Sequence, residues 1–352
     1  MRFFKFSFCL FFLISIHIFS QKYSNDFLSI GVDARSISMS NAVVATSSDV
    51  TSGFYNPAGL NSISNLQFGL MHSSYFGGIT QYDYLGAAVR IDTQFVVAAS
   101  FIRFGIDDIL NTTELLDENG NVNYDNISMF SATDFASIFS IARKTKFNLN
   151  MGLSTKVIHR KIGPFASSWG FGLDFGMQYS YNDWDFGLLM KDFSTTVNFW
   201  DINQDIFSSQ YESSGNMIPE DDIEITYPQF ICGVGKEFAI RNDFTVLSEL
   251  DLITTWDGRR NTLIANDVFS INPAVGLEIG YKKLAFLRFG FGNFQKEVLI
   301  NGNEQMKFQP NFGIGIDVWS FVLDYSLTDL GNNSAVLYSN VFTFKYLSLI
   351  HI

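Results

Sequence analysis

Ionisable side chains that fall in rows of small and polar residues are the groups in this sequence most able to do chemistry. The rows mix acids with bases, so two interpretations arise. The charges can form a hydrogen-bonded network around an internal plug, because unpaired charge in a crowded interior is costly. They can instead line a substrate channel, but the intermixed signs favour the network. The residues concerned are Asp174, Glu249, Asp251, Glu278, Arg288, Asp317, Asp324 and Lys156.

No catalytic constellation is found among the histidines and nucleophiles of the sequence. His72 and His159 fall on expected strands, His351 lies in the tail, and no Ser or Cys signature accompanies them. We therefore expect a protein that is not an enzyme and that holds no cofactor and no metal.

Two long segments, 105–127 and 192–224, are rich in Asp and Glu. A calcium site is one interpretation, because hard cations bind carboxylate oxygens. Neither segment has the spacing of an EF-hand loop. The composition therefore favours the other interpretation, solvated surface loops.

The elements that must position the charged rows are strands, because large apolar residues recur at every second position. From Trp169 to Tyr181 they alternate with Gly, Asp, Gln and Ser, and the pattern returns over 269–281 and 319–327. The side chains of a strand point to opposite faces with a period of two. A soluble sandwich also alternates, but here one face is small and hydrophilic throughout, as a barrel lumen can be.

Fourteen strands are expected, an even number of the kind that bacterial barrels use. Short and long connections alternate, which matches tight periplasmic turns and longer extracellular loops, whereas a Greek-key sandwich has no reason to obey that order. The sequence therefore predicts an all-β fold, a single antiparallel outer-membrane barrel. The strands are expected near 65–75, 79–91, 93–104, 128–142, 146–160, 165–181, 183–191, 225–239, 243–255, 267–281, 284–294, 307–317, 319–327 and 335–346.

The composition argues against two classes of protein. The chain is 47% hydrophobic but has no long uncharged stretch after its N-terminus, which excludes a helical membrane protein. Transmembrane barrels are not excluded, since they place their apolar residues at alternate positions. The net charge of −12 argues against nucleic-acid binding, which needs a basic face.

Residues 1–20 have the features of a secretory signal peptide: two basic residues, then an apolar run from Phe6 to Phe19. The alternative, a membrane anchor, is less favoured because the run is short. Cys9 would leave with this segment, and we expect the mature chain to begin at Gln21 with Cys232 as its one cysteine. No internal disulfide is then expected, and Cys232 is interpreted as a small wall residue.

Three blocks before the first expected strand, 27–39, 42–50 and 54–60, resemble in order the N-terminal signature of the PorV/PorQ family. That family is similar to the FadL transporters, which implies a fourteen-strand barrel whose N-terminal segment is folded into the lumen as a hatch. The residues that the resemblance assigns to the hatch are Gly31, Asp33, Ala34, Arg35, Met39, Asn56, Pro57, Ala58, Gly59 and Leu60.

The resemblance implies that a hatch at 21–64 follows the signal peptide and that the barrel occupies 65–352. PorV-type members serve the type IX secretion system of Bacteroidota-like bacteria, and PorQ-type members serve its cell-surface attachment part. The resemblance thus implies a non-enzymatic accessory, cargo shuttle or partner subunit in the outer membrane. Its partners would be outer-membrane lipid, a large translocon barrel and secreted cargo proteins.

Two other functions compete with this interpretation. One is a FadL-like outer-membrane transporter of hydrophobic small molecules. The other is a purely structural barrel in a surface or motility assembly, which the sequence does not separate from the secretion role.

Overall fold

A computed structural model describes residues 24–113, 115, 121–145, 147–206, 221–241, 243–299, 302–329 and 339–348. The expected signal peptide and the expected mature N-terminus at Gln21 lie outside the described residues. Parts of the two acidic segments, 105–127 and 192–224, also lie outside them.

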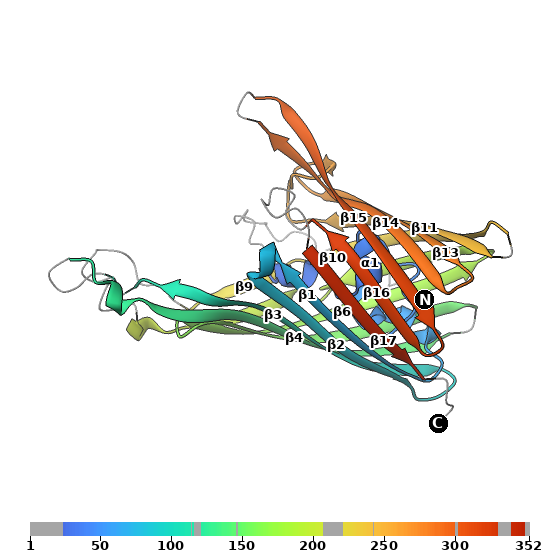
Figure 1. The fold of residues 1–352 in the computed structure, drawn as a ribbon, viewed down its shortest axis with the longest axis horizontal. Helices are drawn as coiled ribbons and strands as arrows, with labels where there is room; N and C mark the ends of the chain where they lie inside the picture. The colour runs from blue at the N-terminus through green and yellow to red at the C-terminus, as the bar shows by residue number, and fades with distance from the viewer. Residues whose placement is uncertain are drawn as a thin grey trace, which may run out of the picture.

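Residues 24–63 form short helices and turns rather than strands. We call them the inner segment, because they lie inside the barrel made by the rest of the chain (Figure 1). The helices are η1 (Asp26–Ser29), α1 (Ala34–Ser38), α2 (Ser52–Tyr55) and η2 (Pro57–Ser62). At the start of η2, the Asn56 side chain accepts a hydrogen bond from the Ala58 N–H and Pro57 takes the first helical position, which is a favoured helix start.

The rest of the described chain is almost entirely β structure. Its strand segments join edge to edge in one antiparallel sheet, and β1 pairs with both β2 and β17, so the sheet closes on itself. Two short helices, η3 (Phe76–Gly78) and η4 (Tyr124–Asn126), lie between strands. The strand segments are β1 (Leu66–Tyr75), β2 (Thr80–Arg90), β3 (Phe95–Asn111), β4 (Ser128–Lys144), β5 (Leu149–Ile162), β6 (Ala166–Tyr181), β7 (Trp184–Lys191), β8 (Thr196–Ile202), β9 (Ile223–Thr226), β10 (Gln229–Ala239), β11 (Phe244–Thr255), β12 (Ile264–Ala265), β13 (Ser270–Tyr281), β14 (Ala285–Val298), β15 (Glu304–Val318), β16 (Phe321–Thr328) and β17 (Ser339–Leu347).

These segments make fourteen strands of the barrel wall. β7 and β8 pair with successive parts of β6, so together they form one interrupted strand. β9 and β10, which pair with β8 and β7, form another. β12 is only two residues long, and β11 pairs directly with β13 beside it. The predicted fold, an all-β closed antiparallel barrel of fourteen strands, is confirmed.

The two faces of the wall differ in chemistry as the alternation predicts. On β6, Trp169 and Phe171 point outward and are 53% and 54% exposed, whereas Gly170, Gly172 and Asp174 point inward and are buried. A closed barrel with an apolar outside is a form in which β structure crosses a membrane, because closure leaves no unpaired strand edge. Separately, no helix in the described part of the chain is long and apolar enough to span a membrane.

The hairpin of β3 and β4 extends beyond the strand ends that the sequence predicts. The expected loop 105–127 begins as strand, since β3 continues to Asn111, and the hairpin projects from the barrel (Figure 1). A bulge between Ile106 and Ile109, with φ of 58° at Asp108, interrupts the ladder there. A bulge adds one residue to one strand and shifts its faces. The alternation in the sequence therefore placed the end of this strand too early, at residue 104 rather than at Asn111.

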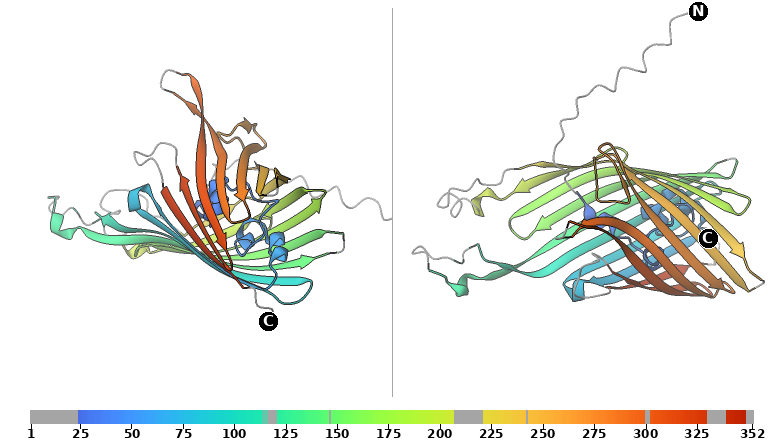
Figure 2. Two further views of the ribbon diagram at one scale, coloured as in Figure 1. Left: turned by 45° about the vertical axis from the view of Figure 1, so that its right-hand side comes forward. Right: turned by 90° about the horizontal axis from the view of Figure 1, so that it is seen from above.

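A second hairpin projects from the barrel where the expected strands 284–294 and 307–317 left a loop. Residues 295–306 are mostly strand, because β14 and β15 pair out to Val298 and Glu304 (Figure 2). The order of short and long connections also has exceptions. The connections at 76–79 and 163–165 are tight although they lie at the end of the barrel that carries the long ones.

The expected loop 192–224 contains β8 and the start of β9, so it too is partly strand. Positive φ angles at Asp192 and Thr195 break the alternation after β7. The sequence pattern therefore did not show that the strand continues as β8. The Phe193 N–H donates to the Leu173 carbonyl oxygen at 2.9 Å. The irregular turn thus stays attached to β6.

The assigned faces predict the effect of a charge in the wall. Leu173 lies midway along β6 on the outward face, so Leu173→Arg should destabilise the folded barrel by roughly 2–4 kcal/mol, the cost of Arg near the bilayer midplane. Tyr181→Arg, at the end of the same strand, is the control and should cost roughly 0–1 kcal/mol. Equilibrium unfolding in lipid vesicles measures both, and equal costs would contradict the assignment.

Candidate functional site

Clusters of buried charge tie the inner segment to the wall, and the first is centred on Lys345 of β17. Its ammonium lies 2.9 Å from Asp33 Oδ1 and 2.6 Å from Asp49 Oδ2, both in the inner segment. The side chains of Lys345 and Asp33 are 3% and 1% exposed. Burial alone would raise the pKa of Asp49, but Lys345 and hydrogen bonds from Thr51 hold that pKa at about 2. Asp49 is therefore ionised at neutral pH.

A second cluster alternates bases and acids. Arg35 of α1 donates from Nε to Glu278 Oε2 at 2.9 Å. Arg288 donates to the same oxygen at 2.5 Å and to Asp324 Oδ1 at 2.6 Å. Each buried acid thus has a basic partner, without which it would be strongly destabilising. The cluster joins α1 to β13, β14 and β16.

A third cluster uses carboxylates of β11 to hold the backbone of the inner segment. Asp251 Oδ2 accepts hydrogen bonds from the N–H groups of Val43 at 3.0 Å and Val44 at 3.1 Å. Glu249 Oε1 accepts from the Ala45 N–H at 2.6 Å. Buried backbone donors need partners, and here the wall supplies them.

A fourth buried group lies beside the break between β7 and β8. The Lys156 ammonium is 2.8 Å from Asp174 Oδ1 and also contacts Asp192. The Asp192 N–H donates to Asp174 Oδ1 at 2.6 Å. This group fastens the interrupted strand to β5 and β6, and it does not contact the inner segment through these bonds.

The structure therefore brings together most of the charged residues that the sequence places in the lumen, in groups of two or three. Asp317 is the exception. It lies at the end of β15, is partly exposed and belongs to none of the four groups. The alternation gives its face correctly, but the strand ends where the lumen opens, so no crowded interior surrounds it.

Inward glycines let the backbone of the inner segment approach the wall. A Cβ at Gly152 would lie 2.3 Å from the Pro57 carbonyl carbon, and one at Gly187 would lie 2.4 Å from the Val44 carbonyl oxygen. No side chain fits at such distances. The small residues in the inward rows are therefore a consequence of a filled lumen rather than of an open pore.

The residues assigned to a hatch all lie in the inner segment. Gly31 has a φ of 109°, which glycine adopts readily, and the Ala34 N–H donates to Thr343 Oγ1 of β17 at 2.8 Å. Asn56 Nδ2 donates to the carbonyl oxygens of Val44 and Met177. Asp33 and Arg35 belong to the first and second clusters. The remaining residues are buried: Met39, Pro57, Ala58, Gly59 and Leu60. Their role as a movable hatch stays a prediction.

Sequence reasoning missed Lys345, Asp49 and Asp192. Lys345 lies between the outer-row residues Phe344 and Tyr346, so the alternation of β17 carried a signal for it. Asp49 and Asp192 lie outside regular strands. No period of two exists there to show which way a side chain points.

The lumen is not completely filled. A chamber of about 880 Å³ remains between the inner segment and the wall, at the end of the barrel with the long connections. One part of its lining is aromatic: Phe27, Phe54, Tyr55, Tyr75, Phe76 and Phe104. Another part carries amides and hydroxyls: Gln229, Asn272, Asn293, Gln295, Gln309, Asn311 and Thr328.

The cations that line the chamber are engaged by neighbouring groups. Lys191 donates to a backbone carbonyl oxygen of η1 at 2.7 Å. Arg160 pairs with Asp134 at 3.0 Å, and Arg260 contacts Asp257 at 3.0 Å. The chamber therefore offers aromatic faces and neutral polar groups as its main binding surfaces.

Comparison with known proteins bears on the fold. No family profile and no curated protein matches the sequence. Among solved structures, the chain is similar to the CymD monoaromatic hydrocarbon channel, with 13% identity, a TM-score of 0.57, and coverage of 92% of this chain and 98% of that chain. The barrel has the FadL-like fold.

Two toluene transporters show the same likeness. TbuX of Ralstonia pickettii has 12% identity and a TM-score of 0.55, with 91% of this chain and 99% of that chain covered. TodX of P. putida has 11% identity, the same TM-score and the same coverage. At such identities the likeness establishes the FadL-like fold alone, and it does not bear on PorV/PorQ membership.

The first cluster yields a prediction about stability. Lys345→Met leaves the carboxylates of Asp33 and Asp49 buried without their cation, which should cost about 3–5 kcal/mol in the free energy of unfolding. Lys282→Met is the control, because Lys282 lies 4.0 Å from Asp243 with both side chains more than half exposed. Urea unfolding of both variants measures the difference. Equal stabilities would mean that the Lys345 cluster does not hold the inner segment.

Proposed function

We propose that the protein is a non-enzymatic outer-membrane barrel that binds hydrophobic small molecules in its lumenal chamber and conducts them across the membrane. The observation that carries this proposal is the chamber of about 880 Å³ with its aromatic side. Preformed cavities of this size that combine aromatic side chains with polar groups are typical small-molecule sites. The likeness in fold to channels and transporters of monoaromatic hydrocarbons and toluene supports the same ligand class.

Passage requires the inner segment to move, because its backbone closes against the wall. Its parts are held by different bonds. The α1 region is held by buried ion pairs. The η1 region is held by hydrogen bonds to neutral acceptors: Asn25 Nδ2 to Thr226 Oγ1 at 2.9 Å, the Tyr82 hydroxyl to the Phe27 carbonyl at 3.0 Å and Lys191 Nζ to the Leu28 carbonyl at 2.7 Å. Breaking such a hydrogen bond costs less than breaking a buried ion pair. We therefore expect the η1 region, which lines the chamber, to move first.

A matched pair on β3 tests the chamber. The Phe104 ring packs inward against Phe27 and Tyr82, with centroids 6.4 and 5.8 Å apart, whereas Phe101 points outward and is 43% exposed. Phe104→Ala should weaken the binding of toluene about tenfold or more, since burial of an aromatic side chain contributes roughly 1.5–3 kcal/mol. Phe101→Ala should leave binding unchanged.

Binding is measured by competition with a fluorescent hydrophobic probe on the purified barrel. Equal losses in the two variants, or a wild-type chain that binds neither toluene nor a longer hydrophobic molecule, would overturn the transport proposal.

We propose an accessory role in type IX secretion as the second candidate, with a large translocon barrel and secreted cargo as partners. It is supported by the three sequence blocks that resemble the PorV/PorQ signature and by the two hairpins that project from the barrel (Figure 2). Exposed apolar residues lie on or beside these hairpins, among them Leu110, Tyr124, Met129 and Val298. Loops on a rigid barrel are free to dock a partner.

Deletion of residues 201–222 separates the two functions. If long loops dock a partner, the deletion should abolish co-purification of the translocon barrel or impair secretion, while the barrel stays heat-modifiable on gels. Unchanged secretion and unchanged co-purification would show that this loop is not the docking surface, and shortening the two projecting hairpins in the same assay would then decide the role. The same deletion should leave toluene binding unchanged if the transport proposal holds and the two functions use different surfaces.

A further inference from the structure

The lumenal chamber has a polar side that the barrel wall supplies. It is made of inward residues on β10, β11, β13, β15 and β16, and we call these residues the polar strip. All of their side chains are amides or hydroxyls, and none carries a charge. The residues of the strip are Gln229, Thr255, Asn272, Gln309, Asn311 and Thr328.

Most of the strip is occupied by bonds within the protein. Gln309 Nε2 donates to Thr328 Oγ1 at 2.8 Å, and Asn311 Nδ2 donates to Ser40 Oγ of the inner segment at 2.6 Å. The Thr255 hydroxyl oxygen is buried so deeply that the chamber does not reach it. These four residues of the strip therefore stabilise the wall and the inner segment, and they do not offer a ligand free donors.

Two amides of the strip keep free hydrogen-bonding groups. Within the described part of the chain, the Gln229 side chain makes no hydrogen bond. Asn272 Oδ1 accepts from the Phe294 N–H at 3.2 Å, and its NH₂ group has no partner among the described residues. Both side chains are partly exposed where they line the chamber. Their strands, β10 and β13, flank β11 and so lie about 10 Å apart.

A free amide constrains what can fill the space beside it. The Gln229 amide offers two donors and an acceptor, all neutral. Water satisfies such a group in an empty chamber, but a ligand that displaces the water has to replace its hydrogen bonds or lose affinity. A ligand with a hydroxyl or carbonyl group makes this replacement, whereas a hydrocarbon does not.

The aromatic side of the chamber meets the polar strip near Gln229. Asn25 Nδ2 donates to Thr226 Oγ1 at 2.9 Å, and Thr226 precedes Gln229 by three residues. This bond holds η1 close to the start of β10. Phe27 of η1 in turn packs against Phe104. One molecule can therefore contact aromatic rings with its body and the free amide with its head.

The charges of the chamber do not favour an ionised ligand. Its lining carries three acids and three bases: Asp26, Asp134, Asp257, Arg160, Lys191 and Arg260. Arg160 is paired with two carboxylates, since it also lies 3.1 Å from Glu224. The Lys191 ammonium donates to the Leu28 carbonyl oxygen and lies 5.3 Å from the centroid of the Phe54 ring, on the aromatic side. A ligand carboxylate would have to compete for cations that are already engaged.

We propose that the chamber selects neutral amphipathic molecules, with an apolar body and a hydroxyl or carbonyl head. This inference rests on the proposed transport function and names its ligand class more closely. The body lies against Phe27 and Phe104, and the head exchanges hydrogen bonds with the Gln229 amide. A second polar group on a larger ligand is met by the NH₂ group of Asn272.

Competition binding to the purified full-length barrel tests the head, with three ligands that share one body: hexylbenzene, 4-hexylphenol and 4-hexylbenzoate. We expect 4-hexylphenol to bind about tenfold more tightly than hexylbenzene, the effect of one satisfied hydrogen bond, and more tightly than 4-hexylbenzoate. Gln229→Met keeps the length of the side chain but removes the amide, so it should bring the ratio of the first two affinities close to one.

Gln81→Met is the matched control, because Gln81 is exposed on the outward face of β2 at the same end of the barrel. It should leave the ratio unchanged. Equal binding of hexylbenzene and 4-hexylphenol to the wild-type chain would overturn this inference and leave the transport proposal intact. Tightest binding of 4-hexylbenzoate would overturn the neutral head, and equal ratios in the two variants would overturn the role of Gln229. Binding of none of the three would overturn the transport proposal and this inference together.

Discussion

Buried ion pairs between the inner segment and the wall are the interaction on which the rest of this structure depends. Lys345 and Glu278 point into the lumen and pair with Asp33, Asp49 and Arg35 of the inner segment, and Asp251 accepts hydrogen bonds from backbone N–H groups of the same segment. A charge left alone in such a place would be strongly destabilising. The wall and the inner segment are therefore complementary, and neither part satisfies its charges alone.

Close approach of backbone to backbone makes these ion pairs geometrically feasible. Glycines at positions such as 152 and 187 remove the side chains that would hold the inner segment away from the strands. The same rows that carry buried acids thus also carry glycine. Rows of small and charged residues that alternate with rows of large apolar ones are thus what this barrel needs to hold its inner segment.

The filled lumen also shapes the candidate functions. Free space remains on the η1 side, where aromatic rings and amides line the chamber. Small molecules fit that space, whereas a folded protein does not, so any role in protein secretion has to use the projecting hairpins and loops. The two proposed functions therefore use different surfaces of one barrel.

The period of two along the chain was sufficient to determine the all-β class, the fourteen strands and the inward face of Asp174, Glu249 and Asp251, because a strand converts residue order directly into face. Composition and turn order then favoured a barrel over a sandwich. Alternation failed at the bulge near Ile109 and at the break after Lys191, since an extra or irregular residue shifts the faces locally.

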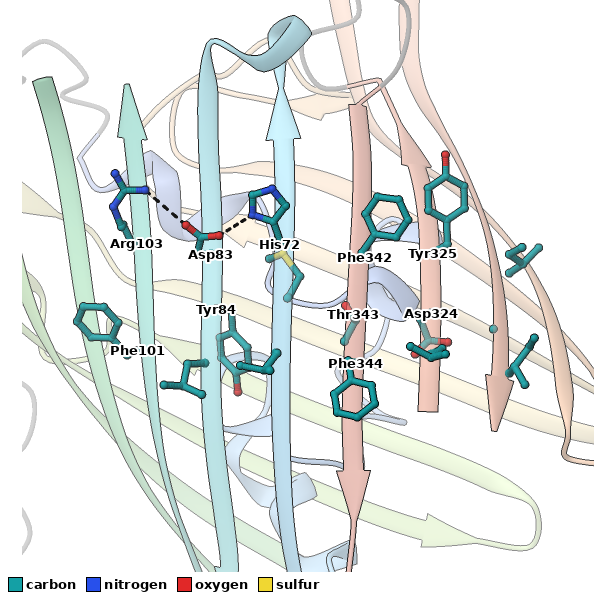
Figure 3. Close-up of a pocket in the computed structure, with 17 residues that line it drawn as sticks. His72, Asp83, Tyr84, Phe101, Arg103, Asp324, Tyr325, Phe342, Thr343 and Phe344 are labelled. Atoms are coloured by element: carbon teal, nitrogen blue, oxygen red, sulfur yellow. Dashed lines mark hydrogen bonds and ion pairs between the residues drawn. The ribbon is translucent and has the colours of Figure 1, made fainter. Parts of the chain in front are cut away.

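The tertiary structure alone determined which charged side chains form ion pairs with one another. Lys345 and Asp49 are 296 residues apart and pair because β17 closes onto β1 around the inner segment. The sequence showed His72 only as a histidine on a strand. The register of β1, β2 and β3 places it in one cross-strand row with Asp83 and Arg103 (Figure 3). Register and closure are long-range properties, so no local pattern encodes the ion-pair partners or the chamber.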